Sequence, residues 1–196
     1  MRQTVHTRPC EPADTDAVAA VLRESFGDDA PAILEVLGRL RAAGDLVVEL
    51  VAVTGEVAGY VALSRAWLDA RERLVDVLVL SPLGVSPAAQ GRGVGTALLE
   101  AATAAASATG VPFVFLEGDP GFYSARGWEA ASTHGLERPS ERIPDPACQV
   151  VLLESHEPWM TGRLVYPDVW WRLDLVGLRD PALEQVESRA GRTGVR

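Results

Sequence analysis

The stretch Ser86–Ala102, SPAAQGRGVGTALLEAA, places glycines at positions 91, 93 and 95. An apolar run precedes it and an alanine-rich run follows it, so the expected order is strand, glycine loop, helix. The N-terminus of a helix presents unpaired N–H groups and a partial positive charge, which attract an anion. Glycines let the backbone approach that anion without a Cβ in the way. The stretch therefore predicts a phosphate or pyrophosphate site, with a tight strand-to-helix turn as the purely structural alternative.

Two other phosphate-binding motifs do not fit this loop. A P-loop requires Gly-Lys-Ser/Thr after the loop, whereas Gly95 is followed by Thr96 and Ala97. A dinucleotide-binding fingerprint has the spacing G-x-G-x-x-G within a parallel βαβ unit, whereas the spacing here is G-x-G-x-G. The glycines therefore indicate a phosphate site of another kind.

Composition limits the class of protein. The 196 residues fit one domain of ordinary size. A hydrophobic share of 47% with 23% charged residues is typical of a soluble globular protein. The net charge of −9 argues against nucleic-acid binding, which needs clustered Lys and Arg, and it would tolerate a cationic substrate such as an amine.

Cysteine usage and the N-terminal sequence bear on the compartment. Cys10 and Cys148 match neither a CxxC pair nor a zinc-binding spacing, so we expect two buried, reduced thiols and no metal. Residues 1–14 contain no apolar segment of the secretory type. No apolar run approaches the ~20 residues that a membrane span requires. These features predict a cytoplasmic protein that does not engage a membrane.

Periodicity predicts alternating helices and strands. Asp14 is expected to cap a helix that reaches Phe26, and Gly44 to end a second helix that covers 31–43. Apolar residues with helical spacing predict a third helix from Val94 to Ala105, ended before Gly110. Strands are expected around 4–10, 46–53, 57–63, within 71–85, and at 111–116, 149–153 and 163–166, with 54–56 as a hairpin turn. The last ten residues are polar and are expected to fray.

The glycine loop also carries a family resemblance. Gln90–Gly95, QGRGVG, fits the Q/R-x-x-G-x-G/A motif of the Gcn5-related N-acetyltransferase (GNAT) family. Leu83–Pro87 before the motif, Tyr123–Trp128 after it and Arg8–Asp14 near the start resemble further elements of that family. The segments GDP at 118–120, PDP at 144–146 and VYP at 165–167 are similar to its YhbS-like branch. The resemblance covers roughly residues 5–170.

The resemblance implies both a fold and an activity. The implied fold is α/β, with a mixed, mostly antiparallel sheet that is splayed and flanked by helices on both faces. The implied domain at 5–170 transfers an acetyl group from acetyl-CoA to a primary amine of a small molecule or protein by direct attack. The remainder, 171–196, is expected to be a partly disordered extension. A non-catalytic acyl-CoA-binding or regulatory module, and an enzyme for a longer acyl donor, remain as alternatives.

Acetyl-CoA contacts are carried over from the family position by position. The backbone of the strand end would pair with the pantetheine arm, and the amides of the loop would meet the pyrophosphate. The residues concerned are Leu83, Gly84 and Val85 on the strand, then Gln90, Gly91, Arg92, Gly93, Val94, Gly95 and Thr96 in the loop and first helical turn. The Val85 N–H would also polarise the thioester carbonyl. Arg92 contacts phosphate or is a solvated charge, and Gln90 is expected to shape the loop.

Acyl transfer to an amine also needs two proton movements, because the amine loses a proton and the CoA thiolate gains one. Tyr123 occupies the position of the family's acid, four residues before Gly127. The alternative role for Tyr123 is an aromatic packed beside Phe122. We therefore regard Tyr123 as the candidate proton donor.

The general base departs from the commoner family pattern. Many members have a carboxylate near the end of the central strand, whereas residues 79–83 contain none. Asp76 is nine strand residues before Val85, about 30 Å away at ~3.3 Å per residue, which rules it out. Glu117 ends the neighbouring strand and is the candidate base. A solvent-facing or salt-bridged Glu117, His134 as the base, and water as the base all stay open.

Four late aromatic residues complete the candidate set. They could line the acceptor site or a homodimer contact, but covering the core is the expected role: Trp159, Tyr166, Trp170 and Trp171. The identity of the amine acceptor is not encoded in any motif of this sequence.

Overall fold

The computed structural model describes residues 4–177, which divide into two compact units. Unit 1 comprises residues 4–65 and 80–110, and unit 2 comprises residues 66–79 and 111–177. Two long strands, β3 (Val57–Ala70) and β4 (Leu74–Val85), contribute residues to both units.

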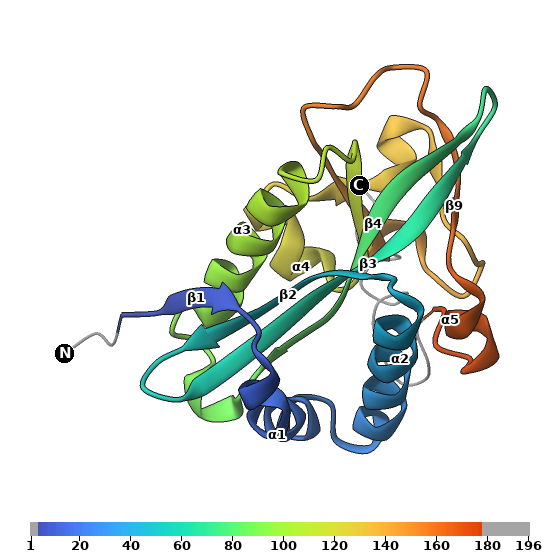
Figure 1. Cartoon of the computed structure of the whole chain (residues 1–196). Helices are drawn as coiled ribbons and strands as arrows, with labels where there is room; N and C mark the ends of the chain where they lie inside the picture. Colours follow the sequence, from blue (N-terminus) through green and yellow to red (C-terminus); the bar gives the residue numbers. More distant parts are fainter. Residues whose placement is uncertain (1–3, 178–196) are drawn as a thin grey trace, which may run out of the picture. The chain divides into compact units, whose positions relative to one another are not determined.

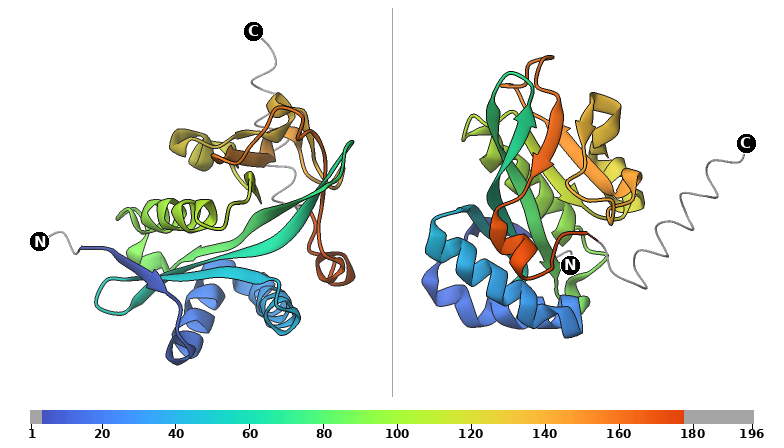
Figure 2. Two further views of the ribbon diagram at one scale, coloured as in Figure 1. Left: turned by 45° about the horizontal axis from the view of Figure 1, so that its top comes forward. Right: turned by 90° about the vertical axis from the view of Figure 1, so that its right-hand side faces the viewer.

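Unit 1 is a small antiparallel sheet with helices on both faces. Strand β1 (His6–Pro9) pairs with β2 (Leu46–Val53), which pairs with the first part of β3. Helices α1 (Thr15–Phe26) and α2 (Ala30–Ala43) lie side by side on one face, and α3 (Val94–Ser107) lies on the other (Figures 1 and 2). Short 3-10 turns occur at Pro12–Asp14, Gly27–Asp29 and Pro87–Ala89.

The helices of unit 1 are held by apolar burial. One cluster joins α1, α2 and the sheet through Val18, Leu22, Leu37, Val51, Tyr60 and Ala62. Each large aliphatic side chain in such a cluster stabilises the fold by about 1.5–3 kcal/mol relative to its exposed state. The cluster fixes α1 and α2 against β2 and β3.

Unit 2 is built around β5 (Phe113–Glu117), which pairs in parallel with β4 and antiparallel with β8 (Cys148–Leu152). The short strand β6 (Glu129–Ala130) extends this side of the sheet by pairing with β8. On the other side, β9 (Gly162–Val165) runs antiparallel beside β3 and parallel with β7 (Leu136–Glu137) (Figure 1). The helices are α4 (Pro120–Tyr123) and α5 (Asp168–Arg172), with 3-10 turns at Ser124–Arg126, Ala131–His134 and Asp145–Ala147.

The strand order β1-β2-β3-β4-β5-β8-β6 confirms the expected mixed, mostly antiparallel, splayed α/β sheet. The pairs β4–β5 and β7–β9 are parallel, and β4–β5 pairing consists of Leu78 with Val114 and Val79 with Phe115. The strand β3 is longer than expected, and the sequence did not predict β6, β7 or α5. Most of the expected C-terminal extension, residues 178–196, lies outside the described residues, as does the polar tail.

Asp14 is the N-cap residue of α1, as predicted, but its side chain makes no capping hydrogen bond to that helix. Asp14 lies in the 3-10 turn before the helix, and its carboxylate turns back to the Arg8 guanidinium at 2.6 and 2.8 Å. It also accepts the Glu11 N–H at 2.8 Å. These partners hold the pKa of Asp14 at about 2. The carboxylate therefore serves the turn and an ion pair in place of the helix end.

Candidate functional site

The loop before α3 has the backbone that the glycines predict. Gly91 and Gly93 have φ angles of +70° and +86°, a region that L-residues with a side chain rarely adopt. Gly93 is the N-cap residue of α3, and its carbonyl accepts the Ala97 N–H at 3.0 Å. Because glycine has no side chain, Gly93 cannot cap the first-turn N–H groups with an oxygen of its own. The helix start is thus suited to an external anion.

Side chains on both sides of the loop fix its base. The Gln90 Nε2 donates to the Val85 carbonyl at 3.1 Å, and the Ser25 hydroxyl of α1 donates to the same oxygen at 3.1 Å. The Ser86 hydroxyl donates to Glu24 at 2.7 Å. The Gln90 side chain therefore bridges the loop to the end of β4, and the strand end at Val85 is tied to α1.

Two glycines inside strands let the helices approach the sheet closely. A Cβ at Gly59 would lie 2.8 Å from Leu98 Cδ1, and a Cβ at Gly84 would lie 3.2 Å from Leu22 Cδ2. The packing role of both residues was not predicted from the sequence. The available signal was a glycine within a strand pattern, which often marks a close backbone approach.

The apolar residues of α3 that pack on the sheet are buried, whereas the loop before the helix is exposed. Val94 and Leu98 are buried, whereas Gln90 to Gly93 are exposed. On the preceding strand, Leu83 and Val85 are half-buried and Gly84 is buried. Gly95 and Thr96 are half-buried in the first turn of α3. All ten residues that were predicted to bind acetyl-CoA lie in unit 1.

Tyr123 and Glu117, the predicted acid and base, lie in unit 2. Tyr123 ends the one-turn helix α4, whose N-cap residue Asp119 accepts the Gly121 N–H at 2.9 Å. Its ring meets Phe122 and Trp128 edge-on, with centroids 4.9 and 6.1 Å away. The ring is thus firmly packed, so the packing role and the acid role are compatible.

Burial raises the pKa of the Tyr123 phenol to about 12, with the Arg126 guanidinium acting in the opposite direction. Desolvation outweighs the nearby positive charge, since burial disfavours the phenolate. Tyr123 therefore keeps its proton throughout the ordinary assay range, and at this pKa it is a weaker acid than the thiol that would receive the proton.

Contacts with Gly118 and Gln149 hold the turn that carries Tyr123. A Cβ at Gly118 would overlap the Tyr123 ring. The buried Gln149 amide of β8 donates to the Gly118 carbonyl at 3.4 Å and accepts from the Ser124 hydroxyl at 3.4 Å. Sequence analysis did not single out Gln149, because a polar residue within a strand pattern gives no sign that it is buried.

Glu117 is the last residue of β5, as predicted, and its side chain is half-buried. Its Oε1 accepts a hydrogen bond from the Tyr166 hydroxyl at 2.7 Å. Its Oε2 accepts the backbone N–H of Gly177 at 3.0 Å. Two donors from the C-terminal part of the chain, which the sequence did not predict, therefore converge on this carboxylate.

The remaining candidates have other partners. His134 Nε2 lies 2.5 Å from a carboxylate oxygen of Glu129. Tyr166 and Trp170 are buried, as a core role predicts, whereas Trp171 is 42% exposed. The Arg73 guanidinium lies over the Trp159 ring, 4.6 Å from its centroid.

Both cysteines are free thiols, but Cys10 is half-buried, so the prediction of two buried thiols holds for Cys148 alone. Burial, followed by the Glu117 and Asp145 carboxylates, raises the pKa of Cys148 to about 12. Burial also raises the pKa of Cys10. Since the thiolate is the nucleophilic form, neither environment favours a covalent role for cysteine.

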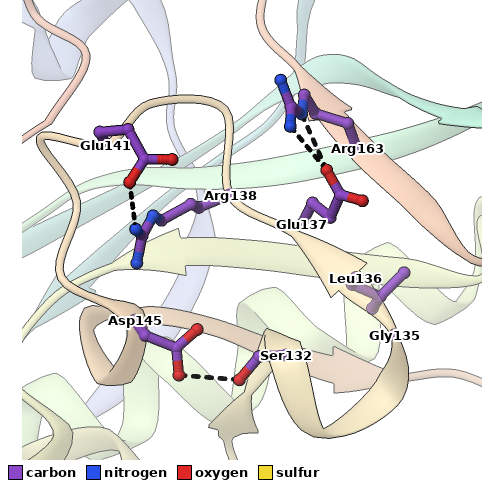
Figure 3. A pocket seen from close by; sticks show the side chains of 8 residues that line it. All are labelled: Ser132, Gly135, Leu136, Glu137, Arg138, Glu141, Asp145 and Arg163. Atoms are coloured by element: carbon purple, nitrogen blue, oxygen red, sulfur yellow. Dashed lines mark hydrogen bonds and ion pairs between the residues drawn. The ribbon is translucent and has the colours of Figure 1, made fainter.

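Unit 2 also contains a polar pocket of about 400 Å³ near β7 and β9 (Figure 3). Its charges are already paired: Arg163 with Glu137 at 2.7 Å, and Arg138 with Glu141. The Ser132 hydroxyl donates to Asp145 at 2.8 Å. None of the predicted acetyl-CoA or catalytic residues lines this pocket.

Within residues 4–177, no group of three or more His, Cys, Asp or Glu side chains is arranged to hold a metal ion. In the same part of the chain, no helix has the length and apolar character needed to cross a membrane.

Comparison with known proteins gives a consistent result. A family model described as the acetyltransferase (GNAT) family matches residues 14–128. The chain is 34% identical over 127 residues to the uncharacterized N-acetyltransferase YhbS of Escherichia coli K12, covering 64% of this chain and 74% of that protein.

Two solved structures are similar over most of the chain. The crystal structure of E. coli YhbS in complex with CoA has a TM-score of 0.75 and 30% identity, and the match covers 86% of this chain and 92% of that one. A GNAT family acetyltransferase from Brucella melitensis in complex with acetyl-CoA has a TM-score of 0.67 and 25% identity, with 86% and 99% covered.

Proposed function

The chain belongs to the GNAT family of acetyltransferases, and from this premise we propose that it transfers an acetyl group from acetyl-CoA to a primary amine. The observation that carries the proposal is the exposed glycine loop at the start of α3, where Gly93 offers no capping side chain. The CoA and acetyl-CoA complexes of the two similar structures support the choice of ligand. The acceptor is an amine of a small molecule or of a protein.

In this proposal, unit 1 binds the cosubstrate. The backbone amides of Gln90 to Thr96 meet the pyrophosphate, and the strand residues Leu83 to Val85 pair with the pantetheine arm. The positive φ angles of Gly91 and Gly93 let the exposed loop lead into the helix, and neither residue carries a Cβ. The Val85 N–H polarises the thioester carbonyl. A helix start that lacks a side-chain cap fits a diphosphate for the reason given above.

The proposed reaction is a direct acyl transfer. The lone pair of the amine attacks the carbonyl carbon, a C–N bond forms, and the C–S bond breaks with its electron pair leaving on sulfur. Tyr123 donates a proton to the departing thiolate, and the proton that nitrogen loses goes to Glu117 or to water. The raised pKa of Cys148 favours this route over an acetyl-cysteine, because a buried thiol is a poor nucleophile.

Replacement of Glu117 by Gln is expected to slow acetyl transfer roughly thirtyfold near pH 6.5. Less of the amine is neutral at low pH, so proton removal by a base matters most there. The ratio of the wild-type rate to the variant rate should therefore shrink as the pH rises toward the amine pKa. The measurement is kcat/KM for the amine across pH 6–10 at saturating acetyl-CoA. A variant with the wild-type pH profile would make water or His134 the better candidate.

A non-catalytic acyl-CoA-binding module is the second candidate. The observation in its favour is the strand segment 79–83, which lacks the carboxylate common in the family. The deciding experiment is release of free CoA thiol from acetyl-CoA across a panel of small amines and lysine-containing peptides. Amine-dependent release supports the enzyme, whereas tight acetyl-CoA binding with no release above solvent hydrolysis supports the module. The same panel with longer acyl-CoA donors tests the acyl preference.

The wider setting is part of the same proposal. We assign the transferase activity to a single domain that spans residues 5–170. Two free cysteines are typical of a protein from a reducing compartment, which favours the cytoplasm. The exposed Trp171 is the aromatic available for a homodimer contact, and sedimentation of the protein tests for such a dimer.

A further inference from the structure

Two hydrogen-bond donors to the Glu117 carboxylate come from the part of the chain after residue 128, where the family-model match ends. The Glu117 Oε1 accepts a hydrogen bond from the Tyr166 hydroxyl at 2.7 Å, and its Oε2 accepts one from the Gly177 N–H at 3.0 Å. The two donors are 49 and 60 residues away from Glu117 in sequence. Two separate segments therefore converge on the same carboxylate.

Tyr166 is fixed before it reaches Glu117. It is 4% exposed, directly after β9, and its ring packs against Trp170 of α5 with centroids 5.9 Å apart. The buried Trp170 Nε1 has no hydrogen-bond partner within the described residues, so the surroundings of this pair are largely apolar. A hydroxyl in such surroundings makes a strong, well-oriented bond to a carboxylate.

The segment that carries Gly177 is held in an unusual backbone conformation. Asp174 has φ +53°, rare for a residue other than glycine, and its carboxylate pairs with the Arg142 guanidinium at 2.7 Å. Val176 is fully buried. Gly177 has φ +90°, and a Cβ there would lie 2.7 Å from the Arg142 Cβ. The Asp174 ion pair and the buried Val176 hold this segment, and its backbone conformation places the Gly177 N–H. Unusual backbone conformations are often found at functional sites.

We propose that Tyr166 and the Gly177 amide form a positioning element for Glu117, which fixes the direction of its carboxylate for the proton of the incoming amine. The inference rests on the proposed function, because it gives Glu117 a role in the amine step. These two hydrogen bonds fix the orientation of the Glu117 side chain, and a carboxylate offers about four lone-pair sites in all. Tyr166 is a positioning residue in this scheme, and it acts only through Glu117.

The test is a double-mutant cycle with Tyr166→Phe and Glu117→Gln. We expect Tyr166→Phe to lower kcat about fivefold, with KM for acetyl-CoA unchanged. The double variant should be no slower than Glu117→Gln alone, because the hydroxyl has no carboxylate left to position. Multiplied losses in the double variant would overturn the inference, as would a fully active Glu117→Gln or a fully active Tyr166→Phe enzyme.

Tyr60→Phe is the matched control. Tyr60 is a buried tyrosine in unit 1 whose hydroxyl donates to Glu49 at 2.5 Å, so its replacement removes the same kind of bond. We expect its kcat to stay within about twofold of wild type. An equal loss in Tyr60→Phe would show that any buried tyrosine bond has this effect, which contradicts a positioning role for Tyr166.

Gly177→Ala provides a second route if Tyr166→Phe does not fold. The added methyl meets Arg142 and must displace the N–H from Glu117. We expect about a threefold loss of kcat in the wild-type background and none in Glu117→Gln. Equal losses in both backgrounds would overturn the inference. An inactive wild-type enzyme across the amine panel contradicts the proposed function, whereas an active one with multiplied losses contradicts this inference alone.

Discussion

Replacement of Gly95 by Asp is expected to weaken acetyl-CoA binding at least about a hundredfold while the fold remains intact. Gly95 is the second residue of α3 and is not among the glycines with positive φ, so its backbone conformation is one that other residues adopt. A carboxylate about 4 Å from a phosphate costs about 4 kcal/mol at an effective dielectric constant near 20. Part of that cost is lost to solvent screening, hence the lower bound on the effect.

The same substitution should leave stability unchanged or raise it. An acidic residue in the first turn of a helix interacts favourably with the macrodipole by about 0.3–1 kcal/mol. Binding and stability are therefore expected to change in opposite directions, which separates lost affinity from unfolding. Gly93→Asp should also abolish binding, but its φ of +86° adds backbone strain to the charge effect.

Titration calorimetry with acetyl-CoA and a thermal melt measure the two quantities. The matched control is Gly38→Asp, which adds the same side chain to α2, where the added Cβ has no atom within 4 Å. Gly38 is exposed, and acetyl-CoA binding should match wild type in that variant. Unchanged affinity in Gly95→Asp would contradict the assignment of the α3 start as the pyrophosphate site.

The sequence predicted those parts of the fold that depend on local pattern. Gly44 was expected to end α2, and it does so with φ +77° in the left-handed region. The apolar spacing from Val94 onward located α3, and the glycines located its exposed loop. Such features are determined within a few residues along the chain, so periodicity and turn chemistry are enough to predict them.

The parts that the sequence did not predict depend on distant partners or on burial. Glu117 was found as a strand end, but its hydrogen-bond donors lie 49 and 60 residues later. Asp14 was predicted as the N-cap of α1, but its carboxylate binds the Arg8 guanidinium and the Glu11 N–H and does not bind the helix. The direction of the Tyr123 pKa shift could not be predicted either, since desolvation depends on the packed structure.

Tyr123→Phe is expected to reduce kcat by about two orders of magnitude and to leave acetyl-CoA affinity nearly unchanged. A positioned proton donor is worth roughly 10²–10⁴-fold, and thiolate is a tolerable leaving group, so the lower end applies. The phenyl ring keeps its contacts with Phe122, Trp128 and the Gly118 backbone, so packing is preserved. The measurement is kcat under conditions where acyl transfer limits turnover, with calorimetry for acetyl-CoA.

The pH dependence of this loss tests the protonation state in which Tyr123 acts. With a pKa of about 12, the Tyr123 phenol stays protonated from pH 6 to 10, so it adds no alkaline limb to the wild-type profile. Loss of the donor should therefore cost the same factor across this range, and the ratio of wild-type to Tyr123→Phe kcat should stay constant from pH 6 to 10 where acyl transfer limits turnover. A ratio within about threefold of unity at pH 7 would make Tyr123 a packing residue. A ratio that falls steeply between pH 7 and pH 10 would contradict a donor that stays protonated throughout.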